Sequence, residues 1–252
     1  MTLLRTRGLT VTVGEHTICR DLDLAVANGE RWALLGGNGA GKTTLLHSLL
    51  GLHTELEGTV ELAGETLAQL RRRRIAQLAG LLPQDSSDPF PASVLETALI
   101  GRHPHLGPWQ WEGAADYAAA RQALAEVGLE ALEDRDVGTL SGGERRRLAL
   151  ATLITQDPAV WLLDEPTNHL DLHHQVTLLQ RVASRSTGAT LMSLHDVNLA
   201  ERFCSHTLLM FGDGETLAGP VEQTLDTAAL SRLYQHPIRR LDDGERRVFI
   251  AE

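Results

Sequence analysis

The pattern of apolar and polar residues divides the chain into alternating strands and helices. Alternating stretches at 9–13 and 17–26 predict half-buried antiparallel strands, and Asn28-Gly29 marks a turn after them. Continuous apolar runs predict the buried strands of a parallel sheet, at 31–35, 159–163 and 190–194. A further strand is expected at 58–62, and hairpins are expected at 208–218 and 238–251.

Helical periodicity accounts for much of the remaining chain, at 43–50, 113–127, 145–154 and 221–234. The segment 86–155 begins with several prolines, continues as an alanine-rich helical pattern and carries little strand signal. We therefore predict an α/β fold with a mainly parallel sheet, an N-terminal antiparallel β region and an inserted α-helical subdomain. The core is expected to comprise 1–85 and 156–252, and the helical subdomain 86–155.

A glycine-rich loop stands between the strand at 31–35 and the helix expected at 43–50. Residues Gly36 to Thr43 fit the pattern G-x-x-x-x-G-K-[ST] of a phosphate-binding loop. Backbone N–H groups of such a loop, and the N-terminus of the helix after it, attract anions. Lys42 would neutralise the outer phosphates, and the Thr43 hydroxyl would ligate Mg²⁺. A glycine-rich turn that carries a lysine by chance is the simpler alternative, but the flanking strand and helix favour the phosphate loop.

Polar residues follow directly after two of the buried strands. Asp164 and Glu165 end the run at 159–163, and His195 ends the run at 190–194. Adjacent carboxylates are costly beside an apolar strand unless they bind something, and the carboxyl ends of parallel strands face a nucleotide crevice. We expect Asp164 to hold Mg²⁺, Glu165 to orient or deprotonate a water, and His195 to reach the same crevice. A lone histidine is more often structural, so the functional role expected for His195 depends on its position at the end of a strand.

The sequence Leu-Ser-Gly-Gly-Glu at 140–144 precedes the helix expected at 145–154. Ser141 and Glu144 have the spacing of a capping box, which explains the motif as an ordinary helix start. Two glycines and a serine at a helix N-terminus also fit a second phosphate cradle. The residues alone leave both interpretations open.

Size and charge bound the function. The 252 residues are 42% hydrophobic, which is ample for a core, and the net charge of −10 argues against a general nucleic-acid binder. No apolar run approaches the roughly 20 residues of a membrane-spanning helix, and residues 1–7 lack the apolar core of a signal peptide. We therefore expect a cytoplasmic protein. Cys19 and Cys204 lie far apart without metal-ligand spacing, and we expect two reduced thiols.

Two other local features have ordinary explanations. The four arginines at 71–74 open an amphipathic stretch with Ile75 and Leu78 on its apolar face, so a solvated helix face is favoured over a nucleic-acid patch. Trp109 and Trp111 stand in a loop region of the helical segment, where core or interface packing is expected.

Several of these motifs occur together in one order. The phosphate loop, Gln84, the Leu-Ser-Gly-Gly-Glu segment, the strand ending at Asp164-Glu165 and His195 succeed one another along the chain. This set resembles the ATP-binding subunit of ABC transporters, over essentially the whole length. The resemblance implies a P-loop NTPase core and the cofactors ATP and Mg²⁺.

The resemblance also implies a role for each matching position. The Walker A loop would comprise Gly36, Gly37, Asn38, Gly39, Ala40, Gly41, Lys42, Thr43 and Thr44. The signature motif would be formed by Ser141, Gly142, Gly143 and Glu144. Mg²⁺ would be held by Thr43, by Gln84 and by Asp164, which would be the Walker B aspartate. Gln84 would also link the core to the helical subdomain. Asp171 would match the D-loop. Catalysis would depend on Glu165 as the base, His195 as the switch histidine, Gln84 and Lys42.

In this family the signature motif caps the γ-phosphate that a second copy binds, so the resemblance implies a head-to-tail dimer with two ATP molecules. It also implies an integral membrane permease dimer at the cytoplasmic face of the membrane, and an external substrate-binding protein. The segment Gly-Arg-His-Pro-His at 101–105 resembles importers of iron–siderophore complexes, haem and cobalamin. A soluble ABC ATPase with an assembly role, or a nucleotide-binding module without catalysis, are the alternatives.

One position departs from the family pattern. Such subunits usually carry an aromatic residue, often tyrosine, that stacks on adenine from the first strand. The corresponding position here is Val13. His16 is a candidate substitute. The sequence therefore does not show which residue contacts the adenine.

Overall fold

A mixed β-sheet forms the centre of the protein. The structure, a computed structural model, describes residues 1–252 except 54, 85–90, 169, 243, 245 and 246. In spatial order, the central sheet contains β6 (Ala79–Leu82), β7 (Val160–Leu163), β8 (Ala189–Ser193), β3 (Arg31–Gly36), β9 (His206–Met210) and β10 (Thr216–Pro220). All neighbours from β6 to β9 pair in parallel, whereas β10 is antiparallel to β9. The predicted mainly parallel sheet is confirmed.

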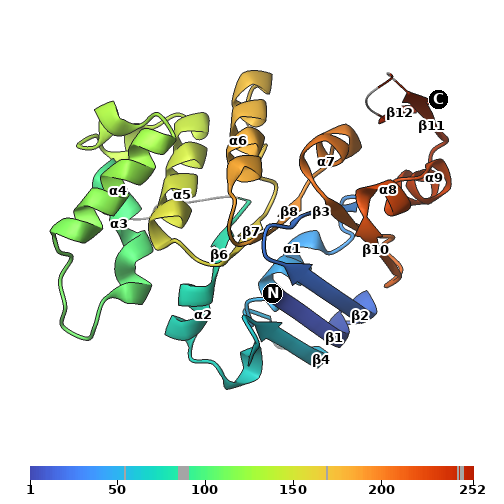
Figure 1. Cartoon of the computed structure of the whole chain (residues 1–252), viewed down its shortest axis with the longest axis horizontal. Coiled ribbons are helices and arrows are strands. Elements are labelled where there is room, and N and C mark those ends of the chain that lie inside the picture. The colour runs from blue at the N-terminus through green and yellow to red at the C-terminus, as the bar shows by residue number, and fades with distance from the viewer. Residues whose placement is uncertain (54, 85–90, 169, 243, 245–246) are drawn as a thin grey trace.

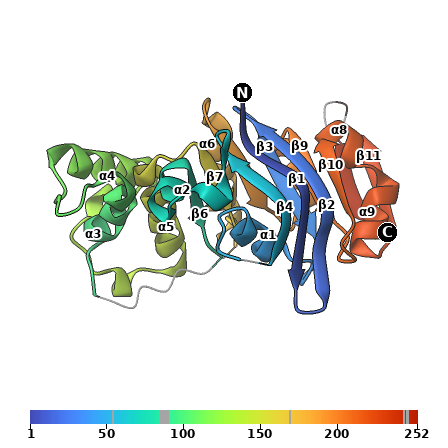
Figure 2. The ribbon, with the colours of Figure 1, turned by 90° about the horizontal axis from the view of Figure 1, so that it is seen from below.

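A second, antiparallel sheet lies beside this core (Figures 1 and 2). Its order is β2 (His16–Ala27), β1 (Thr2–Val13), β4 (Leu56–Leu62) and β5 (Glu65–Thr66). Helix α1 (Lys42–Ser48) buries Leu45 and Leu46 in the same apolar cluster as Leu9 of β1 and Leu34 of β3. This shared cluster fixes the start of α1 against both sheets.

The helical segment of the chain lies to one side of the core (Figure 1). It contains α3 (Val94–Leu99), α4 (Ala114–Glu126), α5 (Gly142–Gln156) and 3₁₀ turns at Ile100–His105, Glu130–Leu132 and Val137–Thr139. Its apolar side chains form a cluster of their own, drawn from residues between Val94 and Ala151. Helix α2 (Arg72–Leu78), after a 3₁₀ turn at Leu67–Gln69, leads into β6 on the core side. The predicted boundary at 85/86 lies outside the described residues.

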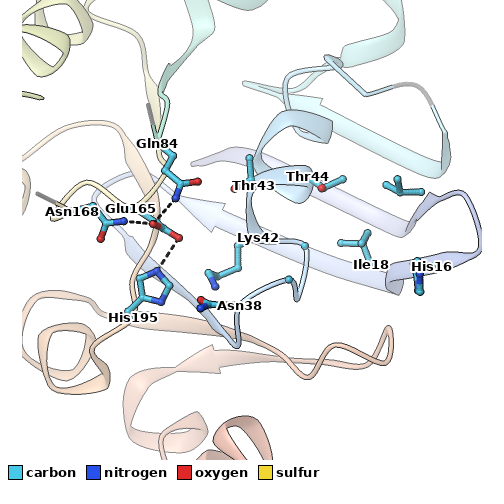
Figure 3. Close-up of a pocket in the computed structure, with 13 residues that line it drawn as sticks. His16, Ile18, Asn38, Lys42, Thr43, Thr44, Gln84, Glu165, Asn168 and His195 are labelled. Atoms are coloured by element: carbon cyan, nitrogen blue, oxygen red, sulfur yellow. Dashed lines mark hydrogen bonds and ion pairs between the residues drawn. The ribbon is translucent and has the colours of Figure 1, made fainter. Parts of the chain in front are cut away.

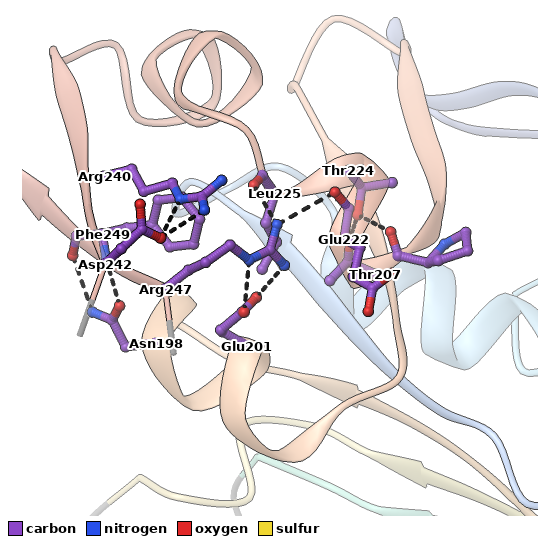
Figure 4. A network of polar contacts seen from close by, with 11 residues as sticks. Asn198, Glu201, Thr207, Glu222, Thr224, Leu225, Arg240, Asp242, Arg247 and Phe249 are labelled. Carbon is purple, nitrogen blue, oxygen red and sulfur yellow. Dashed lines mark hydrogen bonds and ion pairs between the residues drawn. The ribbon is translucent and has the colours of Figure 1, made fainter. Parts of the chain in front are cut away.

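The C-terminal part of the chain adds helices and a separate hairpin. Helix α6 (Leu172–Ser184) follows β7, and α7 (Val197–Phe203) follows β8. The chain ends with α8 (Val221–Thr224), α9 (Thr227–Tyr234) and the hairpin of β11 (Ile238–Asp242) and β12 (Arg247–Ala251). Figure 4 shows how the hairpin is fastened to α7. Arg247 donates to both carboxylate oxygens of Glu201 at 2.8 and 2.7 Å, and Asn198 exchanges two hydrogen bonds with the Phe249 backbone.

The structure also corrects several expectations. Strand β1 begins at Thr2 rather than residue 9, because a bulge at Gly8 (φ +54°) shifts the register and hides the alternation. Trp109 and Trp111 are 99% and 86% exposed, so core packing is wrong for both. The helix expected at 221–234 is divided between α8 and α9.

Two other expectations agree with the structure. Cys19 and Cys204 are buried free thiols, and burial raises the pKa of Cys19 to about 11 and that of Cys204 to about 12. Ile75 and Leu78 form the buried face of α2. Within the described ranges, no helix combines the length and apolar character needed to cross a membrane.

Candidate functional site

A cavity of about 830 Å³ opens at the carboxyl end of the central sheet. Figure 3 shows that side chains from the glycine loop, the β1–β2 hairpin and the ends of β6, β7 and β8 point into it. Its lining comprises Val13, His16, Ile18, Asn38, Gly39, Gly41, Lys42, Thr43, Thr44, Gln84, Glu165, Asn168 and His195. Residues that are 182 positions apart in the sequence thus share one site.

The glycine loop connects β3 directly to α1. Gly41 caps α1 in the left-handed conformation (φ +91°), and a Cβ there would lie 2.4 Å from the Ile18 side chain. Gly41 has no side chain that could cap the first turn of α1, so among the described residues the N–H groups of this turn remain for an anion. Gly36, Gly37 and Ala40 complete the loop but do not line the cavity.

Lys42 is held against its own loop. Its ammonium donates to the carbonyl oxygens of Gly36 and Gly37 at 2.8 and 3.1 Å. Burial lowers the pKa of Lys42, and the nearby carboxylates of Glu165 and Asp164 act in the opposite direction. The lysine is therefore a buried cation whose hydrogen bonds an incoming phosphate can replace.

The carboxylate of Glu165 is the point at which three other side chains converge. Gln84 donates to Oε2 at 2.9 Å, Asn168 donates to the same oxygen, and His195 Nε2 lies 2.8 Å from Oε1 (Figure 3). Glu165 itself has a left-handed backbone (φ +45°), which is uncommon for a residue with a side chain. The structure thus brings together Gln84, Glu165 and His195, three residues for which the resemblance implies a role.

Asp164 lies behind Glu165 and is 1% exposed. Its Oδ1 accepts a hydrogen bond of 2.7 Å from the Ser193 hydroxyl, whereas its Oδ2 is buried and has no hydrogen-bond partner among the described residues. A buried carboxylate oxygen without a donor is costly, and a hard cation is the partner that such an oxygen prefers. Thr43 and Gln84 line the cavity, whereas Asp164 is not among the lining residues. A carboxylate, a hydroxyl and an amide oxygen are the kinds of ligand that fit Mg²⁺.

The buried guanidinium of Arg146 joins the helical segment to this edge of the sheet. It donates to the carbonyl oxygens of Pro83 and Gln84 after β6, and to those of Asp164 and Glu165 after β7. Arg146 follows the Leu-Ser-Gly-Gly-Glu segment on α5. The Arg146 side chain therefore connects the start of α5 to the segments that follow β6 and β7.

The Leu-Ser-Gly-Gly-Glu segment does not reach the cavity of its own chain. Ser141 and Glu144 form the predicted capping box of α5, with the Ser141 hydroxyl 2.7 Å from Glu144 Oε2. Neither these residues nor Gly142 and Gly143 line the cavity. Asp171 caps α6 through the His174 N–H at 2.8 Å and is likewise outside it.

Residues of the β1–β2 hairpin line the part of the cavity where the adenine ring of a nucleotide is expected. Val13 is 41% exposed there, beside His16 and Ile18. Among the residues that line the cavity, His16 and His195 carry the aromatic rings, and His195 is engaged with Glu165. The position of His16 agrees with its candidacy as the ring that contacts a base.

Sequence reasoning missed three residues of the site. Asn168 is assigned no role from the sequence, Arg146 stands within a run of three arginines, and Ser193 lies in an apolar strand. Ser193 offers the one usable signal, because a polar residue within a fully buried strand needs a partner.

A family model and curated relatives both match this chain over most of its length or more than half of it. The family model described as "ABC transporter" matches residues 19–168, more than half of the chain. The ferric enterobactin transport ATP-binding protein FepC of Escherichia coli K12 is 36% identical over 244 residues, which cover 95% of this chain and 90% of FepC. The hemin import ATP-binding protein HmuV of Myxococcus xanthus is 39% identical over 241 residues, covering 92% of this chain and 89% of HmuV.

The fold has close counterparts among solved structures. A metal-chelate type ABC transporter in an inward-facing conformation superposes with a TM-score of 0.86 at 28% identity, covering all of this chain and 97% of the other. A nucleotide-free ATP-binding cassette superposes with a TM-score of 0.78 at 21% identity, which concerns the fold alone.

Proposed function

Because this chain belongs to the ABC transporter family, we propose that it is the subunit that hydrolyses ATP to power import of a metal chelate through a separate membrane permease. The observation that carries this proposal is the convergence of Lys42, Glu165 and His195 on one cavity behind a glycine loop. Iron–siderophore complexes, haem and cobalamin are the proposed class of cargo. The names of the relatives FepC and HmuV support the first two.

The reaction requires that a water attack the γ-phosphate while the developing charge is neutralised. The loop N–H groups and Lys42 would bind the phosphates, with Lys42 exchanging its bonds to Gly36 and Gly37 for phosphate oxygens. Mg²⁺, held by Thr43, Gln84 and Asp164, would supply further charge neutralisation when bound.

Glu165 would accept the proton of the attacking water. Both of its carboxylate oxygens already accept or face donors from Gln84, Asn168 and His195. Within the described part of the chain, Oε1 has one such contact, with His195, so it would keep a lone-pair site at which the attacking water could bind. The imidazole of His195 would exchange its contact with Oε1 for the γ-phosphate.

The second phosphate cradle supports a dimer. Ser141, Gly142 and Gly143 start α5 outside the cavity of their own chain. A nucleotide for this helix start would have to come from a second copy, so we propose that two copies enclose two ATP molecules head to tail. Asp171 would lie at the same interface.

A partner in the membrane completes the proposal. We propose that the chain binds a permease dimer at the cytoplasmic face of the membrane, and that an external binding protein delivers the cargo. The Arg146 contacts would transmit closure of the nucleotide site to the helical subdomain, proposed as 86–155, between core segments 1–85 and 156–252.

The test combines hydrolysis with co-purification. Purified wild-type protein should release phosphate from Mg·ATP, and Lys42→Ala should lose this activity with its fold intact by circular dichroism. Tagged protein extracted in detergent should carry an integral membrane protein with it. Recovery with soluble partners alone would instead favour the assembly role, and a wild-type protein that binds no Mg·ATP would contradict the proposal.

A further inference from the structure

Strand β8 places a buried hydroxyl between the two acids of the site. It runs between β3, which leads into the glycine loop, and β7, which leads into Asp164. Every residue of β8 is buried, and Ser193 at its carboxyl end is fully so. A hydroxyl in such an apolar strand is unfavourable unless both its donor and its acceptor capacity are used.

Ser193 uses both capacities on adjacent residues. Its Oγ donates to Asp164 Oδ1 at 2.7 Å and accepts the backbone N–H of Glu165, also at 2.7 Å. The first contact fixes the rotation of the Asp164 carboxylate and leaves Oδ2 without a partner among the described residues. The second holds the N–H of Glu165, whose left-handed φ of +45° needs support from its surroundings.

We propose that Ser193 is a positioning residue that orients Asp164 so that one carboxylate oxygen remains for the divalent cation, and that holds Glu165 in place beside it. This inference rests on the proposed nucleotide site. Loss of a group that orients a metal ligand through a hydrogen bond typically lowers metal affinity by roughly 10–100-fold. Removal of the Ser193 hydroxyl should therefore act on Mg²⁺ rather than on the nucleotide.

A serine that merely satisfies two buried polar groups would have a different effect. Its loss would lower stability and leave the cation affinity of the folded protein unchanged. Thr190 offers a matched control, because it lies on the same strand, is buried and carries a hydroxyl. Thr190→Val removes that hydroxyl with little change of volume.

The experiment measures binding of a fluorescent, non-hydrolysable ATP analogue to the full chain, in EDTA and across an Mg²⁺ titration. Ser193→Ala should bind the analogue in EDTA as the wild type does, and should need about tenfold more Mg²⁺, or more, for half-maximal tightening. Ser193→Cys fills the site with a slightly larger side chain that is only a weak donor, so it should shift in the same direction. Thr190→Val should follow the wild type.

Equal Mg²⁺ midpoints, within twofold, for Ser193→Ala or Ser193→Cys and the wild type would overturn the inference. The two variants keep the test decisive if one of them does not fold. A wild type that binds the analogue with Mg²⁺ but hydrolyses no ATP would contradict the proposed function alone, because the Mg²⁺ midpoints still decide the role of Ser193.

Discussion

The starts of α1 and α5 have similar sequences but different surroundings. Each helix begins at a glycine-rich segment, yet the first turn of α1 lines the cavity and has no side-chain cap, whereas α5 begins away from the cavity with a complete capping box. Lys42 at the start of α1 is buried, whereas Ser141 at the cap of α5 is exposed.

This difference separates a complete site from an incomplete one. At α1, the uncapped N–H groups, Lys42 and the facing carboxylate of Glu165 come from one chain. At α5, Ser141 satisfies the Glu144 N–H, while the N–H groups of Gly142 and Gly143 belong to the first turn that no intrahelical carbonyl reaches. The contrast supports the proposed dimer, in which α5 completes the site of the other copy.

The largest expected effect comes from Glu165→Gln. Loss of the base should slow hydrolysis by roughly 10²–10⁴-fold, while binding of ATP persists. With hydrolysis slowed, the two-copy form should accumulate in Mg·ATP and elute earlier in size-exclusion chromatography. The double variant with Lys42→Ala should stay monomeric. Turnover within a few-fold of the wild type would show that Glu165 is not the base.

A pair of alanine substitutions should separate the two helix starts. Gly41→Ala must force a Cβ into the Ile18 side chain at a left-handed φ, so we expect it to lose ATP binding in the isolated subunit. At Gly142 no atom of the described residues lies within 4 Å of a Cβ, so Gly142→Ala should fold and bind ATP normally.

Gly142→Ala should nevertheless lower hydrolysis about tenfold, because its methyl group would meet the nucleotide of the second copy. Equilibrium binding of a fluorescent ATP analogue and phosphate release distinguish the two variants. Unchanged hydrolysis in Gly142→Ala would break the comparison, because α5 would then have no part in the reaction.

Local chemistry explains which parts were predictable. The glycine loop, the acids after β7 and the histidine after β8 stand where secondary structure changes, so their place along the chain predicts their place at the edge of the sheet. The fold class followed in the same way from apolar runs and helical periodicity. These signals are short-range and can be read from the sequence.

The missed parts depend on contacts between distant strands. Arg146 binds carbonyls after β6 and β7, and Ser193 reaches Asp164 only because β8 lies beside β7 in a given register. The exposure of Trp109 likewise depends on what surrounds its loop rather than on its own hydrophobicity. No periodicity in the sequence encodes these neighbours.

The smallest expected effect comes from substitutions in two capping boxes of the same composition. Ser93 and Glu96 start α3 in the way that Ser141 and Glu144 start α5. Ser141→Ala should lower the free energy of unfolding by ~1 kcal/mol, seen as a drop of roughly 2–4 °C in Tm, and Ser93→Ala should give a comparable drop. Only Ser141→Ala should also reduce hydrolysis, which phosphate release at equal fractions of folded protein would measure.

The same pair predicts a dependence on pH. Hydrogen bonds from the Ser141 hydroxyl and N–H lower the pKa of Glu144, and those from Ser93 lower that of Glu96. A carboxyl whose pKa is lower in the folded state stabilises the fold above its unfolded pKa, and this contribution is lost as pH falls through the folded value. The stability difference between wild type and Ser141→Ala should therefore be full at pH 7 and shrink below about pH 4. A difference in urea unfolding that stays constant down to pH 3 would show that Glu144 does not contribute through its charge.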